Sequence, residues 1–221
     1  MRIGLFGGTF NPIHFGHLRA AVEIRERFGL DRVYLIPAAI PPHKAQSGIV
    51  SPANRLEMIR LAVGNDTDYI VSDVELMRSG PSYTIDTLSF FENLLPETDP
   101  RFLIVGLDAF LEFHTWKDFM GIMNRIPLIV MGRPGAYDKR HFADMPPEIA
   151  EYLDVLTPGY EYDRQQSVFF HPEFQPVYLI GITSLDISSS EIRSLVRKGR
   201  SIRFLVPEKV SEFIANKGLY Q

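Results

Sequence analysis

The feature that most constrains the fold is a regular alternation of short apolar runs with amphipathic segments. Six apolar runs have the length and composition of parallel strands covered on both faces: residues 2–6, 33–36, 69–72, 102–105, 127–131 and 177–180. Between several of these runs, apolar residues recur at helical spacing, as in Leu18, Ala21 and Phe28 or Leu56, Ile59 and Val63. Strands that alternate with helices predict an α/β fold with a doubly wound parallel sheet. Sheets of this kind bind ligands at the carboxyl ends of their strands, where the strand order reverses.

The chain has 221 residues, of which 45% are hydrophobic, and this is enough to bury the core of one domain. No internal repeat or interdomain linker is visible, so we expect a single domain over residues 1–221. Two stretches break the alternation. Residues 37–52 contain four prolines, and residues 132–176 mix Pro, Gly and aromatics around one expected helix at 147–156. We expect residues 132–176 to form a lid or an interface, and residues 187–221 to form C-terminal helices.

Composition excludes several classes of protein. The absence of cysteine excludes disulfides and thiolate chemistry and favours a reducing compartment. The first strand begins at Arg2, which leaves no room for a signal peptide, and no apolar stretch is long enough to cross a bilayer. We therefore expect a cytoplasmic protein without a membrane partner. The net charge of −4 argues against a nucleic-acid partner, so any phosphate site must be a local basic cluster.

The first chemical motif spans residues 8–17, which directly follow the first apolar run and precede the first amphipathic one. A helix start has free backbone N–H groups and positive partial charge, so it suits an anion such as phosphate. His14 and His17 lie within one turn of this start, and Gly7 and Gly8 allow a close approach of the ligand. Either His alone is more often a cap or a surface residue. The pair favours a phosphate site that is neither a P-loop nor a dinucleotide-binding fingerprint.

A second motif lies at residues 187–193. Ser188 and Glu191 form a capping box, which predicts another helix start after a strand. Taken alone, these serines are simple caps and Arg193 is a solvated helix residue. Together with the first motif, the serine hydroxyls and the planar guanidinium predict a second group of phosphate ligands. Two helix N-termini would then face one polyphosphate.

These two motifs resemble those of the nucleotidylyltransferase superfamily, in which an H-x-G-H motif and a late I-S-S-T-x-[IV]-R motif bind the nucleoside triphosphate. Within the superfamily, the chain is most similar to bacterial nicotinate-nucleotide adenylyltransferases. The segments that narrow the resemblance are residues 40–44, residues 80–87, residues 104–110 with Trp116, and residues 133–135. The resemblance covers nearly the whole chain and implies a Rossmann-like fold.

The resemblance implies roles for individual residues on the ATP side. His14, His17 and Arg193 are the expected catalytic residues, which bind the triphosphate and stabilise charge on it. Ser188, Ser189 and Lys44 are expected to bind the phosphates as well. The adenosine half is expected to contact the backbone around Gly7, Gly8, Thr9 and Phe10, with Gly106 and Asp108 toward the ribose and Ile187 beside the base.

On the acceptor side, the resemblance implies that a pyridine mononucleotide binds near Thr84 and Trp116, with its ring stacked on the indole. Lys117 and Arg133 complete the expected acceptor site. Without the motif around it, Trp116 would be read as a packing anchor, Asp108 and Thr84 as helix caps, and Lys44 as solvated. His114, His141 and His171 match no motif and are expected to be structural.

The implied reaction needs no covalent nucleophile, because the phosphate of nicotinate mononucleotide can attack the α-phosphorus of ATP in line, releasing pyrophosphate. Catalysis is then positioning and charge stabilisation. The expected cofactor is Mg²⁺, held mainly by the ATP phosphates and water rather than by protein ligands. Many family members have Asp where this chain has Asn11, so a direct carboxylate role at that position is excluded.

Several alternatives stay open at this point. Nicotinamide mononucleotide or phosphopantetheine could replace nicotinate mononucleotide as acceptor, since related adenylyltransferases and cytidylyltransferases share both end motifs. A non-catalytic nucleotide sensor could use the same fold, although both histidines and Arg193 are present. A class I aminoacyl-tRNA synthetase is disfavoured by the lack of an anticodon-binding region. The sequence does not determine whether the chain forms a homo-oligomer.

Overall fold

The computed structural model describes residues 1–41, 48–132, 146–183 and 185–221. Within these residues, eight strands form one sheet in the order β3-β2-β1-β4-β5-β8-β7-β6. Six of the strands run parallel and correspond to the six predicted apolar runs: β1 (Ile3–Gly8), β2 (Arg32–Pro37), β3 (Tyr69–Val71), β4 (Arg101–Gly106), β5 (Leu128–Gly132) and β8 (Val177–Gly181). The predicted α/β fold is therefore confirmed.

The sheet differs from the prediction at one edge. A hairpin of β6 (Glu161–Asp163) and β7 (Val168–Phe170) continues the sheet antiparallel to β8, so the sheet is mixed rather than purely parallel. Each of these strands has only three residues, which is too short for an alternating pattern to stand out in the sequence. Helix α7 (Pro146–Leu156) precedes the hairpin and matches the helix predicted at 147–156.

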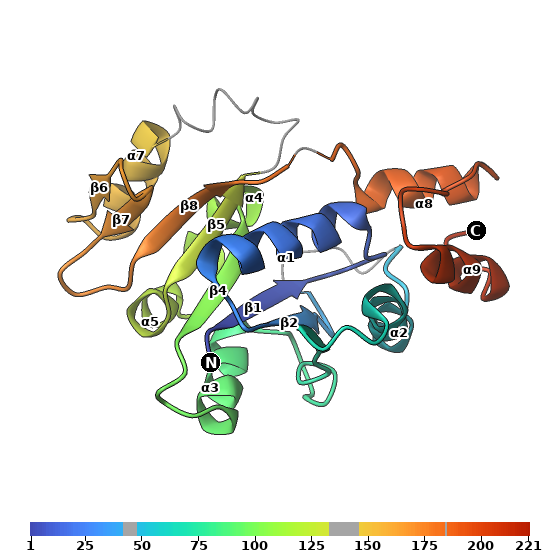
Figure 1. The fold of residues 1–221 in the computed structure, drawn as a ribbon, viewed down its shortest axis with the longest axis horizontal. Coiled ribbons are helices and arrows are strands. Elements are labelled where there is room, and N and C mark those ends of the chain that lie inside the picture. The colour runs from blue at the N-terminus through green and yellow to red at the C-terminus, as the bar shows by residue number, and fades with distance from the viewer. Residues whose placement is uncertain (42–47, 133–145, 184) are drawn as a thin grey trace.

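Helices cover both faces of the sheet (Figure 1). One face carries α1 (Phe15–Phe28), α2 (Pro52–Val63), α8 (Ser189–Arg197) and α9 (Glu208–Asn216). The other carries α3 (Thr84–Leu94), α4 (Leu107–Phe110), the 3₁₀ turn η1 (Phe113–Thr115), α5 (Phe119–Arg125) and α7. Successive residues of β4 alternate between the two hydrophobic cores, with Leu103 and Val105 in one and Phe102 and Ile104 in the other. Burial on both faces explains why the strands are continuously apolar.

The order of the strands reverses between β1 and β4. β1 pairs with β2 from Ile3 opposite Arg32 to Gly8 opposite Pro37, while its other edge pairs with β4. The chain builds β1, β2 and β3 outward in one direction, and then returns through α3 to place β4 on the opposite side of β1. In open α/β sheets, a crevice for ligands forms outside the carboxyl ends of the strands at such a reversal. The loops that follow β1 and β4 are therefore the expected walls of a site.

The C-terminal helices and the insertion lie at opposite ends of the molecule. Helix α9 lies beside α2 at one end, where α8 also lies, and α7 lies with β6 and β7 at the other (Figure 1). The helices predicted within residues 187–221 thus correspond to α8 and α9. Part of the predicted insertion at 132–176, including His141, lies outside the described residues, and its role as a lid or an interface stays a prediction. Among the described helices, none combines the length and apolar character that crossing a membrane requires.

Two glycines in β1 experience opposite environments. A Cβ atom at Gly4 would lie 2.8 Å from Leu30 Cδ1 and 2.9 Å from Ile104 Cδ1, and both side chains are buried. A Cβ atom at Gly7 would meet no atom within 4 Å, because this residue lies at the strand end that opens toward the loops. The core therefore requires glycine at position 4 but not at position 7.

We expect Gly4→Ala to be less stable than Gly7→Ala by about 1–3 kcal/mol, the usual cost of overpacking a closely packed core. Both substitutions reduce the conformational entropy of the unfolded chain equally, so the difference between them isolates the packing cost. Urea unfolding followed by circular dichroism measures both free energies of unfolding. Equal stabilities would show that Leu30 and Ile104 move aside at no cost.

Candidate active site

A cleft of about 560 Å³ opens at the carboxyl ends of β1 and β4, which is a suitable size for a nucleotide. Most of the predicted site residues line it: Gly7, Gly8, Thr9, Phe10, Thr84, Gly106, Asp108, Trp116, Lys117, His17, Ser188, Ser189 and Arg193. His14 and Ile187 are not among the lining residues, and Lys44 and Arg133 lie outside the described residues. The structure therefore brings together residues from both sequence motifs and from the middle segments.

The two histidines lie at the start of α1, one behind the other. His14 is the N-cap residue and is 2% exposed, while His17 lines the cleft. Their ring centroids are 3.7 Å apart with an angle of 34° between the planes. A Cβ atom at Gly16 would lie 3.0 Å from His14 Nδ1, so glycine is needed between the two histidines. In this conformation His17 is the histidine that can contact a ligand. The buried ring of His14 packs against the ring of His17.

The end of β1 is shaped by the aromatic ring of Phe10. A Cβ atom at Gly8 would lie 2.9 Å from this ring, so only glycine allows the two residues to pack so closely. Phe10 is buried and has a φ of 46°, in the left-handed region that a non-glycine residue rarely adopts. Its ring lies edge-on to His17 with the centroids 5.1 Å apart. The backbone turn after β1 thus carries strain that the surrounding packing holds in place.

The start of α8 is tied directly to the loop between β1 and α1. Ser188 caps the helix by accepting a hydrogen bond from the N–H of Glu191 at 3.2 Å, as the capping box predicts. Ser189 Oγ donates to the carbonyl oxygen of Pro12 at 2.9 Å, and Arg193 Nη1 donates to that of Asn11 at 2.9 Å. A guanidinium has five N–H donors, so Arg193 keeps others for a ligand in the cleft. These hydrogen bonds therefore hold the N-terminus of α8 against the loop that leads into α1.

The side chain of Asn11 links three segments of the chain by hydrogen bonds, a role that sequence reasoning did not identify. Its side chain is buried, and Nδ2 donates to the Gly48 carbonyl at 2.9 Å while Oδ1 accepts from the Val50 N–H at 3.2 Å. Oδ1 also accepts a 2.9 Å hydrogen bond from the Tyr220 hydroxyl, and burial raises the pKa of Tyr220 above its ordinary value. The hydroxyl therefore stays protonated and can donate. The amide connects the first loop to the segment before α2 and to the C-terminus.

Arg55 is a second residue that links segments around the cleft by hydrogen bonds, and it is absent from the predicted site. Its side chain is fully buried on α2. It donates three hydrogen bonds, to the carbonyl oxygens of Thr9 at 2.9 Å, Ala39 at 3.0 Å and Val50 at 3.1 Å. The only sequence signal is a charged residue directly beside the apolar stripe of this helix, which usually indicates a solvated position. Its three acceptors belong to three separate segments around the cleft.

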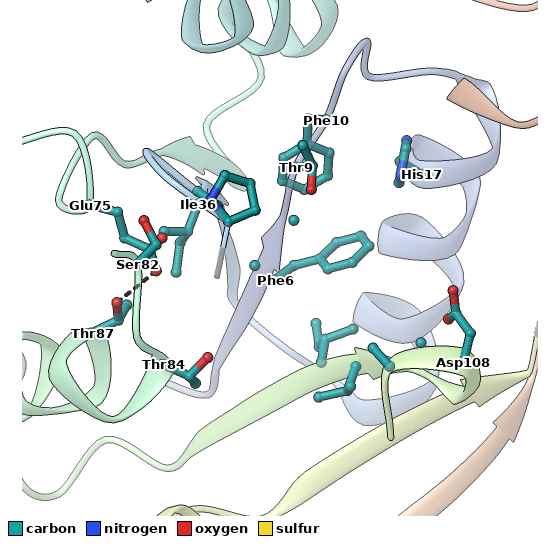
Figure 2. Close-up of a pocket in the computed structure, with 18 of the residues that line it drawn as sticks. Phe6, Thr9, Phe10, His17, Ile36, Glu75, Ser82, Thr84, Thr87 and Asp108 are labelled. Carbon is teal, nitrogen blue, oxygen red and sulfur yellow. Dashed lines mark hydrogen bonds between the residues drawn. The ribbon is translucent and has the colours of Figure 1, made fainter. Parts of the chain in front are cut away.

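Asp108 and Gly106 lie at the end of β4, on the side of the cleft where His17 lies. A Cβ atom at Gly106 would be 2.6 Å from Asp108 Oδ1, so the carboxylate folds over the strand end and glycine makes room for it. Figure 2 shows His17 and Asp108 on one side of β1, with Thr9 and Phe10 at its end. A carboxylate beside a helix N-terminus is an appropriate acceptor for ribose hydroxyls.

The opposite side of the cleft contains Thr84 and the segment around Trp116. Trp116 is half-buried and its ring lies 4.8 Å from that of Phe113. Lys117 Nζ lies 4.6 Å from the centre of the Tyr83 ring and 3.3 Å from both carboxylate oxygens of Asp86. An aromatic platform and a cation thus lie side by side. This half of the cleft also contains Glu75, a buried carboxyl that sequence reasoning missed.

The histidines predicted to be structural make structural contacts. His114 Nδ1 lies 3.0 Å from the Tyr152 hydroxyl, and His171 Nε2 lies 3.0 Å from the Pro158 carbonyl oxygen. Neither lines the cleft. In the described parts of the chain, no group of three or more His, Cys, Asp or Glu side chains could hold a metal ion.

Comparison with known proteins agrees with this geometry. The cytidylyltransferase-like family matches residues 5–195. The chain is 42% identical over 222 residues to a probable nicotinate-nucleotide adenylyltransferase of Desulfatibacillum aliphaticivorans, with all of both chains covered. It is 45% identical over 221 residues to the protein of the same name in Geobacter sp. (strain M21), covering 100% of this chain and 98% of the relative.

A solved structure with the same fold is that of Plasmodium falciparum nicotinic acid mononucleotide adenylyltransferase complexed with NaAD. It superposes with a TM-score of 0.73 and covers 99% of this chain and 97% of its own, at 19% identity. These findings confirm the resemblance that the two motifs predict. The chain belongs to the cytidylyltransferase-like family and, within it, to the nicotinate-nucleotide adenylyltransferases.

Proposed function

We propose that this protein transfers the adenylyl group of ATP to nicotinate mononucleotide, producing nicotinate adenine dinucleotide and pyrophosphate in NAD biosynthesis. The observation that carries this proposal is the cleft at the β1/β4 reversal. One of its sides has two linked helix N-termini, and the other has an aromatic platform beside a cation. The names of relatives at 42% and 45% identity support the same reaction.

The triphosphate would bind between the starts of α1 and α8. Both helix starts supply positive partial charge, and His17, Ser188, Ser189 and Arg193 supply side-chain donors at the cleft wall. His17 would stabilise the charge that develops at the α-phosphate during in-line attack, with His14 packed behind it. Lys44 stays part of this proposal through the family resemblance.

The adenosine half would lie along the ends of β1 and β4. The open space at Gly7 allows a ligand to approach the backbone closely, and Gly8, Thr9 and Phe10 continue the same wall. Gly106 and Asp108 would face the ribose. Ile187 lies close to the start of α1, since its carbonyl oxygen would be 3.7 Å from a Cβ atom at Gly16, and we assign it to the base.

The acceptor would bind on the opposite side, with its pyridine ring against Trp116 and its polar groups near Thr84 and Lys117. Arg133 belongs to this proposal through the resemblance alone.

We propose Mg²⁺ as the cation that accompanies ATP. It would be held by phosphate oxygens and water, since Mg²⁺ commonly keeps several waters at nucleotide sites, and when bound it neutralises charge on the phosphates.

A pyrophosphate-release assay with ATP, Mg²⁺ and a panel of acceptors tests the proposed reaction. We expect the highest kcat/KM with nicotinate mononucleotide, a lower value with nicotinamide mononucleotide and no release with phosphopantetheine. Faster release with phosphopantetheine would reassign the acceptor. Binding of ATP without release with any acceptor would favour a nucleotide sensor.

The role of His17 predicts a large kinetic effect. We expect His17→Ala to lower kcat by about a hundredfold or more, because a preorganised donor to the transition-state charge is lost. His171→Ala is the matched control, since His171 makes its contacts outside the cleft. The same pyrophosphate-release assay measures both variants. Near-normal turnover of His17→Ala would remove His17 from the proposed mechanism.

A further inference from the structure

Glu75 is a buried carboxyl in the wall of the cleft for which the proposed chemistry has no role. It lies between β3 and α3, is 8% exposed and lines the cleft. Burying a carboxylate is costly unless donors surround it. Its hydrogen-bond partners therefore indicate what the carboxylate does.

The first partner is Thr87, in the first turn of α3. Thr87 Oγ1 donates to Glu75 Oε1 at 2.7 Å and accepts from Arg78 Nη2 at 2.7 Å (Figure 2 shows the Thr87–Glu75 bond). A hydroxyl has one proton, and a guanidinium can only donate. The other acceptor near Thr87 Oγ1, the Tyr83 carbonyl oxygen, is 3.4 Å away, so the closer carboxylate is the main acceptor of the proton and Glu75 holds the start of α3 in a fixed orientation.

The second partner is Ser82, just before α3. Ser82 Oγ accepts from the N–H groups of Ala39 at 2.8 Å and Ile40 at 3.3 Å, so its own proton is available for the nearby carboxyl of Glu75, whose pKa the Ser82 hydroxyl lowers. Ser82 N–H also donates to the Ile40 carbonyl at 3.0 Å. This serine therefore holds the loop after β2 against the segment before α3, next to Glu75.

The two hydroxyls are placed on either side of Tyr83 and Thr84, which line the acceptor side of the cleft. Burial raises the pKa of Glu75, while the two hydroxyl donors and the nearby Arg78 and Arg55 act in the opposite direction. These donors and positive charges offset part of the cost of burying the carboxyl, although the net shift of its pKa is upward. Figure 2 places Glu75, Ser82, Thr84 and Thr87 together, across β1 from His17 and Asp108.

We propose that Glu75 is a positioning residue for the acceptor: by accepting a hydrogen bond from Thr87, next to the hydroxyl of Ser82, it fixes Tyr83 and Thr84 and so sets the affinity for the pyridine mononucleotide rather than for ATP. This inference rests on the proposed function. A residue that merely stabilised the fold would alter both substrates alike, so the ratio of the two effects is the informative quantity.

The test is a comparison of KM values for the two substrates in Glu75→Gln and Thr87→Val. A glutamine side chain has one acceptor oxygen and an NH₂ group that cannot accept, so only one of the two positions that accept in the carboxylate can still accept a hydroxyl proton. Valine has nearly the shape of threonine without the hydroxyl. We expect each variant to raise the KM for nicotinate mononucleotide about tenfold, with the KM for ATP changed less than about twofold. The double variant should be less than additive, because both changes break the same bond.

Glu92→Gln is the matched control. Glu92 also lies on the α3 segment, but it pairs with Arg125 away from the cleft. We expect Glu92→Gln to leave both KM values unchanged. This variant tests the general effect of removing a carboxylate from this helix. Circular dichroism checks folding of every variant, and if Glu75→Gln does not fold, Thr87→Val provides the same comparison.

Two results would overturn the proposal. Equal increases in both KM values would show that Glu75 only stabilises the fold, and unchanged KM values in folded variants would show that the loop needs no such support. Either result with an active wild type overturns this inference alone. A wild type that releases no pyrophosphate with nicotinate mononucleotide overturns the proposed function and this inference with it.

Discussion

The site depends on how the loop between β1 and α1 is held by hydrogen bonds to its carbonyl groups. Arg55 donates to the carbonyl of Thr9, Arg193 to that of Asn11 and Ser189 to that of Pro12. An anion is repelled by carbonyl oxygens and attracted by N–H groups, so a phosphate-binding loop benefits when its carbonyls are occupied by other partners. These donors come from α2 and α8, which are distant in sequence. The proposed phosphate-binding loop is therefore held in this shape only when the whole fold forms.

The position of the cleft follows from the path of the chain. Because β4 returns to the free edge of β1, the loops after the two strands diverge and leave a crevice between them. α1 starts directly after β1 on one face of the sheet, while α3 lies on the other face and contributes Thr84 at its start. The proposed nucleotide side and the proposed acceptor side of the cleft thus belong to different layers of the protein.

The fold and most of the cleft could be predicted from the sequence, because local patterns encode them. Continuous apolar runs specify buried strands, and Ser188 with Glu191 specifies a helix start. Asn11, Arg55 and Glu75 could not be identified, since their roles come from partners distant in sequence, such as Tyr220 for Asn11. Arg55 and Glu75 are charged residues, for which solvation is the usual expectation. The β6–β7 hairpin was not predicted, because its strands are too short to show an alternation of apolar and polar residues.

The two sides of the cleft differ in the charges that line them. The proposed nucleotide side contains helix N-termini and the guanidinium of Arg193, which would attract phosphates. The acceptor side contains the carboxyl of Glu75, which would repel an acidic ring if its charge were uncompensated. Two hydroxyl donors together with Arg78 and Arg55 offset that charge, and Lys117 adds a cation at the same side of the cleft. The network that fixes Tyr83 and Thr84 therefore also makes this half of the cleft compatible with a negatively charged acceptor.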